Sequence, residues 1–569
     1  MKASDYIVQY LIDRDVRHVF GYPGGMVTHL MDSLDKRRDE IASHLTYHEQ
    51  GAAFAACGYA QAGGGVGVAY ATSGPGATNL VTGICNAWFD SLPVVFITGQ
   101  VNTAEAKGDF EIRQRGFQET DIVSMVAGVT KFAATITCAD DLKDHLDRAF
   151  DLAISGRKGP TLLDIPMDVL RSDVDFPARA ARSSVDQGCE LSSEFAGQLE
   201  QALAKAQRPV ILLGNGVKSV GGSSKAREVL EGLEVPVVSS MLAVDVMGGS
   251  DCYFGFIGAY GDRAANFIVA KSDLVLALGA RMDVRQVGAM RSSFAPSAKI
   301  LRVDIDQGEL DYHVHDDETG ICADALQALE SIGRMPRSLF KKNDEWLGVC
   351  RAVKKKLADV DDEAFPNAMM SRIGSLLPRN AMVMSDVGQN QVWVAQSLGA
   401  RGDRKIFTSG GHGSMGYSLP AAIGCCHATG EVVYSFNGDG GIQMNIQELQ
   451  TIAREQLPVK IIIFNNSSLG MIRHFQEMYF DRRYVQTVSE GGYTTPDFEA
   501  LAKAYGISYA SARMISDIDD HLFDGKEPCI VEIKIEEYTY VLPKLEFGKP
   551  NQDQEPLIDR SLYKELMAL

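Results

Sequence analysis

GDGGIQMNIQELQTIAREQLPVKIIIFNN, residues 438 to 466, is the stretch of this chain that decides its fold. An apolar run precedes it, a stripe with helical spacing follows the glycines, and a second apolar run leads to its end. This pattern predicts a strand, a crossover helix and a second, parallel strand. Both strands end at one edge of the sheet, so the Asp439 carboxylate and the Asn466 amide are expected to converge there. Two hard oxygen donors beside Gly438 and Gly440, which admit a close backbone, suit a magnesium ion clamped on a diphosphate.

The composition is that of a globular α/β protein. Of 569 residues, 45% are hydrophobic and 23% are charged, which are ordinary values. Repeated strand-then-helix patterns favour an α/β class with three doubly wound parallel-sheet domains. The net charge of -19 argues against nucleic acid as a partner, because phosphate binding needs clustered Lys and Arg.

The chain shows no sign of a membrane segment or an export signal. No run reaches the roughly 18 apolar residues of a membrane span. The N-terminus carries acidic residues where a signal peptide would be basic, so a cytoplasmic protein without a membrane partner is expected. The cysteines lack CxxC spacing. Neither a zinc site nor a disulfide framework is therefore predicted, and reduced thiols are expected.

Two polar stretches, 171–193 and 335–363, interrupt the α/β rhythm and divide the chain into three segments. The first and third segments each contain a glycine-rich turn, and the middle one has Gly214-Asn215-Gly216 after an apolar run. We expect domains at residues 1–172, 190–340 and 364–545, with a C-terminal tail at 546–569.

A candidate acid lies in the first segment. Residues 46 to 60, TYHEQGAAFAACGYA, place Glu49 among small and apolar residues at the start of a predicted helix. A carboxyl group there suits proton exchange with a weakly basic ring nitrogen. The alternative is a helix N-terminal Glu that is stabilised by the helix dipole. The diphosphate motif of the third segment favours the catalytic interpretation.

The chain resembles the catalytic subunit of acetohydroxyacid (acetolactate) synthase, a thiamine-diphosphate enzyme, over almost its whole length. The motifs that carry the resemblance occur in the family's order: GYPGG at 21–25, HEQGA at 48–52, SGPGATN at 73–79, FQE at 117–119, VGQ at 387–389, TSGG at 408–411, GSMGY at 413–417 and GM at 470–471. Any one of them could be a structural turn, so their shared order is the argument. The resemblance implies a pyrimidine-binding first domain, a Rossmann-like middle domain of the FAD type and a diphosphate-binding third domain.

The resemblance also implies roles for individual residues. Glu49 would protonate the aminopyrimidine of the cofactor, Met415 would support its bent shape, and the Gly413 carbonyl would accept a hydrogen bond from the pyrimidine amine. Asp439, Asn466 and the carbonyl of Ser468 would hold magnesium. The expected catalytic residues, which would surround the substrate-derived intermediate, are Glu49, Gln118, Gly25 and Phe117. The remaining residues expected around the thiamine cofactor are Gly388, Gln389, Asn390, Gly438, Gly440, Gly470 and Met471, with Asn390 standing where the family usually has His.

FAD is the second cofactor that the resemblance implies. Its expected contacts are Arg157, Gly214, Gly216, Arg281, Asp304 and Asp306. Arg281 would also steer the incoming keto acid. The flavin is not needed for a redox-neutral reaction, and many thiamine enzymes keep this middle fold without flavin, so a flavin-free middle domain stays open.

The acceptor substrate is the least determined feature. Phe475 stands where synthases that prefer 2-ketobutyrate carry Trp, and the smaller ring loses contacts worth about 1–3 kcal/mol. The loop 102–116 is longer than usual in the family and richly charged. With Arg281, Phe475 and Met471 as substrate residues, pyruvate is the expected donor. The acceptor is a second pyruvate, giving acetolactate, or a ketone such as a keto-deoxysugar nucleotide, as in yersiniose-type carboligases.

Other functions and the assembly also stay open. A simple decarboxylase or oxidase would release acetaldehyde or acetate, and a non-catalytic cofactor-binding scaffold would release nothing. In this family the Glu-bearing domain of one subunit faces the diphosphate-bearing domain of another, which implies a homodimer or a tetramer. No feature indicates a regulatory subunit.

Overall fold

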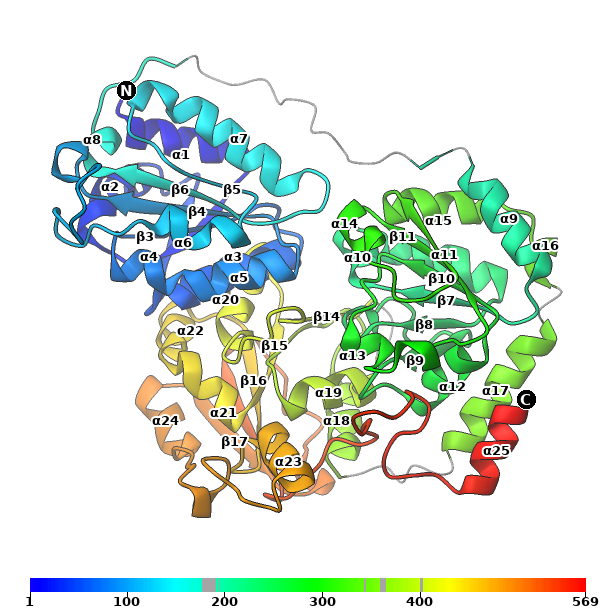
Figure 1. Cartoon of the computed structure of the whole chain (residues 1–569). Coiled ribbons are helices and arrows are strands. Elements are labelled where there is room, and N and C mark those ends of the chain that lie inside the picture. Colours follow the sequence, from blue (N-terminus) through cyan, green and yellow to red (C-terminus); the bar gives the residue numbers. More distant parts are fainter. Residues whose placement is uncertain (177–190, 193, 342–343, 359–364, 400–402) are drawn as a thin grey trace.

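The computed structural model describes residues 1–176, 191–192, 194–341, 344–358, 365–399 and 403–569. It contains three six-stranded sheets, each parallel throughout and each with helices packed on it (Figure 1). The predicted α/β class with three doubly wound sheets is confirmed. Of the two predicted linkers, 177–190 and 193 in the first and 342–343 and 359–363 in the second lie outside the described residues. The predicted domain boundaries stay a prediction.

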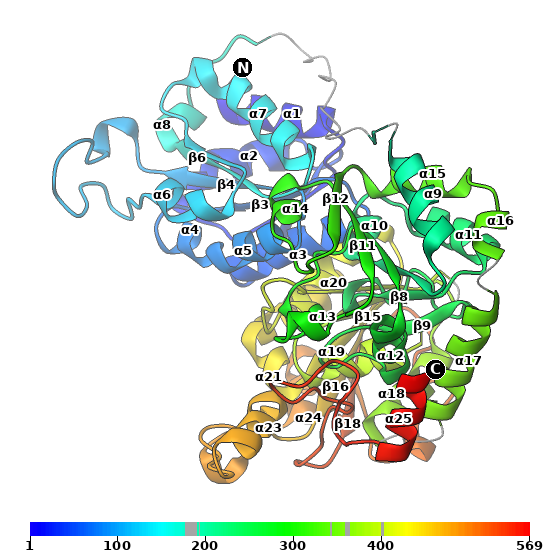
Figure 2. The ribbon, with the colours of Figure 1, turned by 45° about the vertical axis from the view of Figure 1, so that its right-hand side comes forward.

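The first sheet has the strand order β2-β1-β3-β4-β6-β5. Its strands are β1 His18–Gly21, β2 Ala42–Leu45, β3 Gly67–Ala71, β4 Val94–Gln100, β5 Phe132–Thr135 and β6 Thr161–Pro166. Its helices are α1 Ala3–Asp13, α2 Thr28–Lys36, α3 Glu49–Gln61, α4 Pro75–Asn79, α5 Val81–Phe89, α6 Ile122–Val126, α7 Leu142–Ile154 and α8 Met167–Leu170. Figure 2 shows the segment between β4 and α6 projecting from the body of this domain.

The middle sheet has the order β12-β11-β10-β7-β8-β9. Its strands are β7 Pro209–Leu213, β8 Val237–Ser239, β9 Tyr253–Phe256, β10 Leu274–Leu278, β11 Lys299–Asp304 and β12 Glu318–Cys322. The helices of this part of the chain are α9 Phe195–Lys205, α10 Asn215–Ser219, α11 Ser223–Leu233, α12 Arg263–Lys271, α13 Val284–Val287, α14 Gln307–Asp311, α15 Ala325–Gly333, α16 Ser338–Lys341 and α17 Asp344–Ala358.

The third sheet has the order β14-β13-β15-β16-β18-β17. Its strands are β13 Met382–Ser385, β14 Lys405–Thr408, β15 Val433–Gly438, β16 Val459–Asn465, β17 Ser508–Ala512 and β18 Cys529–Lys534. The helices from here to the end of the chain are α18 Phe365–Leu376, α19 Gln389–Ser397, α20 Ser418–Thr429, α21 Asp439–Ile442, α22 Leu449–Glu455, α23 Gly470–Tyr479, α24 Phe498–Tyr505 and α25 Arg560–Ala568.

The strand-helix-strand unit predicted from residues 438–466 is present, with one difference. Strands β15 and β16 pair in parallel with Gly438 opposite Phe464, so both end at the same edge of the sheet. The crossover is broken into α21, a 3-10 segment at 443–448 and α22, with non-helical backbone at Asn445. The Asn445 amide donates to the Gly416 carbonyl at 2.9 Å and to Gln50 Oε1 at 3.2 Å. These tertiary hydrogen bonds accompany a break that helical spacing alone does not reveal.

The first and third domains pack through α3 and α20, which lie side by side in Figure 1. A Cβ atom on Gly58 would come within 2.1 Å of the Ala421 carbonyl oxygen, and one on Gly424 within 1.8 Å of the Ala55 carbonyl oxygen. Glycine at these two positions therefore lets the helix backbones touch. Buried side chains of both domains form one continuous apolar core around this contact.

The C-terminal tail returns to the middle domain. Helix α25 packs through Leu566 against α12 and α17, and Arg263 of α12 donates to the carbonyls of Gln554 at 2.9 Å and Pro556 at 2.7 Å.

Eight cysteines of the described residues are free thiols, as predicted, whereas Cys322 is disulfide-bonded, so the prediction of reduced thiols is wrong there. Among the described residues, no helix combines the length and apolar character needed to cross a membrane.

Candidate functional site

Asp439 stands at the carboxyl edge of the third sheet, directly after β15, and its side chain is buried. Its two carboxylate oxygens accept hydrogen bonds from the backbone N–H of Gly440, at 3.0 Å, and of Ser468, at 3.2 Å. Burial raises the pKa of Asp439 to about 7, and the Tyr493 hydroxyl donates to it. No cationic side chain among the described residues contributes to this shift, so a bound divalent ion would neutralise the buried carboxylate.

Asn466 and Ser468 lie beside this carboxylate. The Asn466 amide nitrogen donates to Gln389 Oε1 at 2.9 Å, so its amide oxygen is the atom left to offer to a cation. Ser467 between them has a φ of +51°, and this turn brings the Ser468 backbone against Asp439. The three predicted magnesium residues are thus gathered at one point, and an all-oxygen donor set fits magnesium.

Three helices begin at this edge, namely α19 at Gln389, α21 at Asp439 and α23 at Gly470. Helix N-termini present free N–H groups and a positive dipole end, which favour a diphosphate. A Cβ atom on Gly470 would lie 1.9 Å from Gln389 Oε1, and one on Gly440 would lie 2.6 Å from Leu469 Cδ2. These glycines therefore allow the converging segments to approach one another. Gly388 has a φ of +137°, which glycine tolerates, at the start of α19.

Asn390, also predicted to contact the thiamine cofactor, lies next to the turns at Gly388 and Gly438. Its amide nitrogen donates to the carbonyls of Asp386 at 2.9 Å and Phe436 at 3.3 Å. Its Oδ1 would be 3.1 Å from a Cβ atom on Gly388 and 3.3 Å from one on Gly438. In this structure the side chain joins the ends of β13 and β15, and its contact with a diphosphate stays a prediction.

The loop that carries Gly413 and Met415 follows β14, and Gly413 has a φ of +71°. The Met415 methyl group would be 3.5 Å from a Cβ atom on Gly440, so Met415 lies next to the Asp439 turn. The fully buried Asp386 fixes this loop by accepting from Gly416 N–H at 3.0 Å. Sequence reasoning missed Asp386, although a carboxylate directly after β13 was a usable signal.

The predicted catalytic residues of the first domain form a second group, at the edges of β1 and β3. Glu49 begins α3, and its buried carboxylate accepts from the Asn79 amide at 2.9 Å. Gln118 has a φ of +64° and contacts the turn at Gly74, where a Cβ atom would be 2.9 Å from Gln118 Cβ. A Cβ atom on Gly25 would meet no atom within 4 Å, so this glycine faces open space.

The two groups do not meet within one chain through any hydrogen bond between described residues. Gln50, next to Glu49, accepts a hydrogen bond from Asn445 of the third domain, whereas Glu49 itself accepts one from Asn79 of the first domain. Phe117 is 79% exposed, so no described part of the same chain covers it. Each group is therefore half of the predicted site.

Met471 and Phe475, the predicted substrate residues of the third domain, lie on α23. Met471 is partly buried against the core of its own domain. Phe475 is 49% exposed, with its ring 4.7 Å from that of Tyr479 and 6.0 Å from that of Phe480, measured between centroids. Together with the exposed Ile472, these rings form an apolar surface beside the Asp439 turn. Arg281, the third predicted substrate residue, follows a strand of the middle domain and lines a separate cavity.

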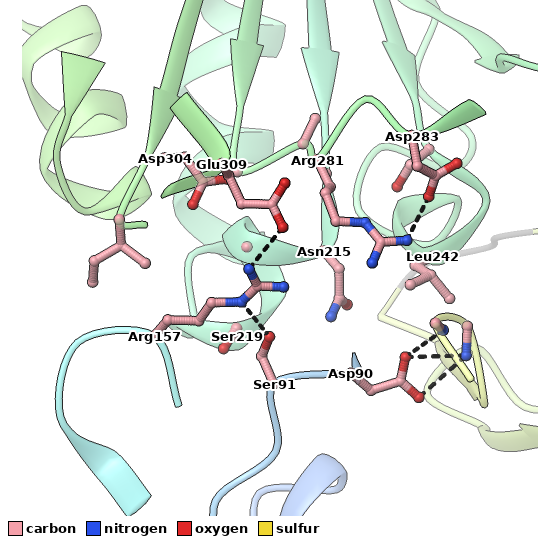
Figure 3. A pocket seen from close by; sticks show the side chains of 18 of the residues that line it. Asp90, Ser91, Arg157, Asn215, Ser219, Leu242, Arg281, Asp283, Asp304 and Glu309 are labelled. Atoms are coloured by element: carbon pink, nitrogen blue, oxygen red, sulfur yellow. Dashed lines mark hydrogen bonds and ion pairs between the residues drawn. The ribbon is translucent and has the colours of Figure 1, made fainter. Parts of the chain in front are cut away.

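This cavity has a volume of about 590 Å³ and is lined by all three domains (Figure 3). Arg157, Gly214, Gly216, Arg281 and Asp304 line it, as the FAD prediction requires. Asp306 lies outside the lining and forms an ion pair with Arg157 at 2.8 Å. Arg157 also pairs with Glu309 at 2.8 Å and donates to Ser91 at 2.9 Å, so it bridges the first and middle domains.

The lining fits a dinucleotide-type ligand. Gly214 and Gly216 follow β7 in contact with the backbone of Gly279, from which Cβ atoms would be 2.0 Å and 2.7 Å away, the close packing that phosphate-binding turns need. Asp304 ends β11, and its carboxyl oxygens offer acceptors for ribose hydroxyl groups.

Sequence reasoning missed Asp90, which lines the same cavity. It accepts from Gly411 N–H at 2.7 Å and thereby ties the first domain to the loop of Met415.

Three family models match consecutive parts of the chain. They describe the "Thiamine pyrophosphate enzyme, N-terminal TPP binding domain" at residues 1–125, the central domain at 197–332 and the C-terminal TPP binding domain at 386–533. These ranges contain Glu49, the Gly214 turn and the Asp439 turn, respectively.

Similar proteins extend over nearly the whole chain. The "Acetolactate synthase isozyme 2 large subunit" of Escherichia coli (strain K12) is 34% identical over 97% of this chain and 99% of its own length. The "Probable acetolactate synthase large subunit" of Methanocaldococcus jannaschii is 36% identical over 94% of this chain and 92% of its own. The "Acetolactate synthase large subunit" of Lactococcus lactis subsp. lactis is 34% identical over 96% and 94%. The resemblance predicted from the motifs is therefore confirmed, and the chain belongs to the acetolactate synthase family of thiamine pyrophosphate enzymes.

Proposed function

We propose that this protein removes carbon dioxide from pyruvate and joins the remaining two-carbon unit to a second pyruvate, giving acetolactate. The observation that carries the proposal is the convergence of Asp439, Asn466 and Ser468 at one sheet edge in a chain whose relatives are named acetolactate synthases. The test supplies the purified protein with pyruvate, thiamine pyrophosphate and Mg²⁺ and identifies the products by NMR. Acetolactate and carbon dioxide in equal amounts are expected. Acetaldehyde or acetate as the main product would contradict the proposal.

The chain's residues divide the work. When bound, thiamine pyrophosphate supplies the nucleophilic carbon and the electron sink for decarboxylation. Asp439, Asn466 and the Ser468 carbonyl would hold magnesium on its diphosphate, and Met415 would support the cofactor from the side of Gly440. Glu49 would exchange a proton with the pyrimidine ring, and its hydrogen bond from Asn79 orients the carboxylate for this task.

We infer that the complete site forms between two copies of the chain. Within one chain, Glu49 and the Asp439 turn are not joined, Gly25 faces open space and Phe117 is 79% exposed. Pairing the first domain of one copy with the third domain of another would cover these residues and bring the halves together. A homodimer is the smallest assembly that does this. Analytical ultracentrifugation distinguishes a dimer from a monomer. A fully active monomer would contradict the inference.

FAD is the second cofactor that we propose, held in the cavity of Figure 3. The purified protein should be yellow and should release about one flavin per chain on denaturation. Asp304→Ala should weaken FAD binding about 10- to 100-fold, because it removes hydrogen-bond acceptors worth about 1–3 kcal/mol. Asp311→Ala, at the exposed end of α14, is the matched control and should retain the flavin. Wild-type protein that is purified without flavin and does not bind added FAD would contradict this assignment.

The choice of acceptor depends on α23. Phe475 is half-exposed, and the charged loop 102–116 belongs to the first domain, which the proposed dimer pairs with the third domain of the other copy. This combination favours a larger ketone, such as a keto-deoxysugar nucleotide, as a second candidate acceptor. Phe475→Trp should raise the preference for 2-ketobutyrate over pyruvate as acceptor about 10- to 200-fold, because the larger ring contacts the ethyl group. Competition between the two keto acids, with product ratios measured by mass spectrometry, gives this value. Phe480→Trp, on the neighbouring ring, is the control, and an equal shift in both variants would contradict a specific role of Phe475.

A further inference from the structure

A cluster of three histidines and a glutamate joins the first and third domains, outside the residues that the proposed function uses. His18 lies at the start of β1 and His44 on β2, whereas His427 belongs to the last turn of α20 and Glu455 ends α22. The histidine ligand nitrogens all lie within 4.8 Å of one another. We propose that His18, His44 and His427 bind a late first-row divalent cation, with zinc as the test ion, which links the two domains.

The geometry of His44 supports this proposal. Its Nε2 lies 2.9 Å from His18 Nδ1, and its Nδ1 lies 3.0 Å from Glu455 Oε2. A carboxylate on the far nitrogen of a histidine is the usual means of orienting a metal-binding imidazole. Tetrahedral Zn–N bonds of about 2.0–2.1 Å place ligand nitrogens about 3.3 Å apart, so His18 and His44 need to separate only slightly to admit the ion.

His427 supplies the third nitrogen. Its Nε2 is buried, and its nearest charged partner is Glu455 Oε2 at 3.1 Å, the same carboxylate oxygen that contacts His44. Its ring stacks on His44 with centroids 3.7 Å apart, so it must rotate about its own side-chain bonds to join the other two. One carboxylate oxygen is thus shared by two imidazoles, and a metal ion would give the His427 nitrogen a partner of its own.

The surroundings of the cluster are largely apolar. His44 is buried, and His18 and His427 are half-buried. The rings of Phe20 and Tyr59 pack around the cluster, with centroids 5.4 Å and 5.7 Å from His44 and His18, respectively. Three imidazoles and a nearby carboxylate favour zinc over the magnesium expected at Asp439.

Binding is measured by isothermal titration of zinc into untagged, chelator-treated full-length protein. Saturating Mg²⁺ and thiamine pyrophosphate occupy the site at Asp439 throughout. One zinc per chain is expected, and Co²⁺ in its place should give the visible absorption of a tetrahedral nitrogen site. The double variant His18→Gln/His427→Gln should bind zinc at least about 10- to 100-fold more weakly.

Two comparisons make the result decisive. His521→Gln, which removes a histidine whose side chain is 83% exposed, should bind zinc as the wild type does. Zinc should raise the unfolding temperature of the wild type and of His521→Gln but not of the double variant. If the double variant folds poorly without metal, the single variant His427→Gln replaces it. Wild-type protein that takes up no zinc, or variants that bind it equally well, would overturn the proposal in favour of a purely hydrogen-bonded cluster, and neither result would affect the proposed carboligase activity.

Discussion

Glu49→Gln should reduce carbon dioxide release from pyruvate by about 100- to 10,000-fold while leaving thiamine pyrophosphate binding largely unchanged. The amide keeps the size of the side chain and can still meet Asn79, whose amide lies 2.9 Å from Glu49. It cannot exchange the proton that the pyrimidine ring requires, and loss of a general acid or base costs a factor of this size. Initial rates of carbon dioxide release, measured at saturating cofactor, test the expectation.

The control for this variant is Glu40→Gln, which changes an exposed carboxylate of the same domain. It should retain wild-type rates. Cofactor affinity is determined in parallel by fluorescence titration, so that a loss of binding is separated from a loss of chemistry. Full activity of Glu49→Gln would contradict both the catalytic role of Glu49 and the proposed reaction.

Asp439→Asn should weaken Mg²⁺-dependent binding of thiamine pyrophosphate by about 100-fold or more. The substitution keeps the shape of the side chain but removes the charge that balances the ion. It also places an amide NH2 group opposite one of two backbone N–H donors, those of Gly440 and Ser468. Breaking a buried charge pair by removing one partner costs about 3–5 kcal/mol. Calorimetric titration with cofactor and Mg²⁺ gives the affinity.

Asp481→Asn is the matched control, since its side chain is 91% exposed in the same domain. Its positive φ of +50° also suits asparagine, so this variant should fold and bind the cofactor normally. If Asp439→Asn binds cofactor and Mg²⁺ as tightly as the control does, Asp439 is not a metal ligand.

The stability of the cofactor-free protein should depend on pH through the same residue. Burial raises the pKa of Asp439 from 3.8 to about 7, so the folded state holds a proton that the unfolded state has lost. Stability therefore falls as pH rises from about 4 to about 7, and it stays reduced above that range. Asp439→Asn should lack this part of the decline. Chemical unfolding at pH 5 and pH 8, with and without Mg²⁺ and cofactor, measures the difference.

Much of the fold follows from periodicity in the sequence. The two apolar runs around residues 438–466 are long and bounded by turns, and they became the parallel strands β15 and β16. The break at Asn445 did not follow, because the hydrogen bonds that accompany it go to Gly416 and Gln50, which are distant in sequence. The spacing of apolar residues within one segment does not reveal hydrogen bonds to distant segments.

The site was predictable where a motif fixes both the residue type and its place at a strand end, as with Asp439 and Gly214. Asp386 and Asp90 were missed because their task is to accept backbone hydrogen bonds from the distant residues Gly416 and Gly411. The histidine cluster was missed because its members come from four separate elements and are distant in sequence. Phe117 was named from its motif, but its exposure shows that one chain alone does not enclose it.

The backbone contact between α3 and α20 also determines how the protein unfolds. Because Gly58 and Gly424 allow the two helices to touch, and because the apolar core continues across them, neither domain can lose its structure without exposing the core of the other. The first and third domains should therefore melt as one cooperative unit, although the middle domain separates them along the chain. The segment of polypeptide that folds together is thus discontinuous in sequence, and the third domain expressed by itself would present the apolar face of α20 to water.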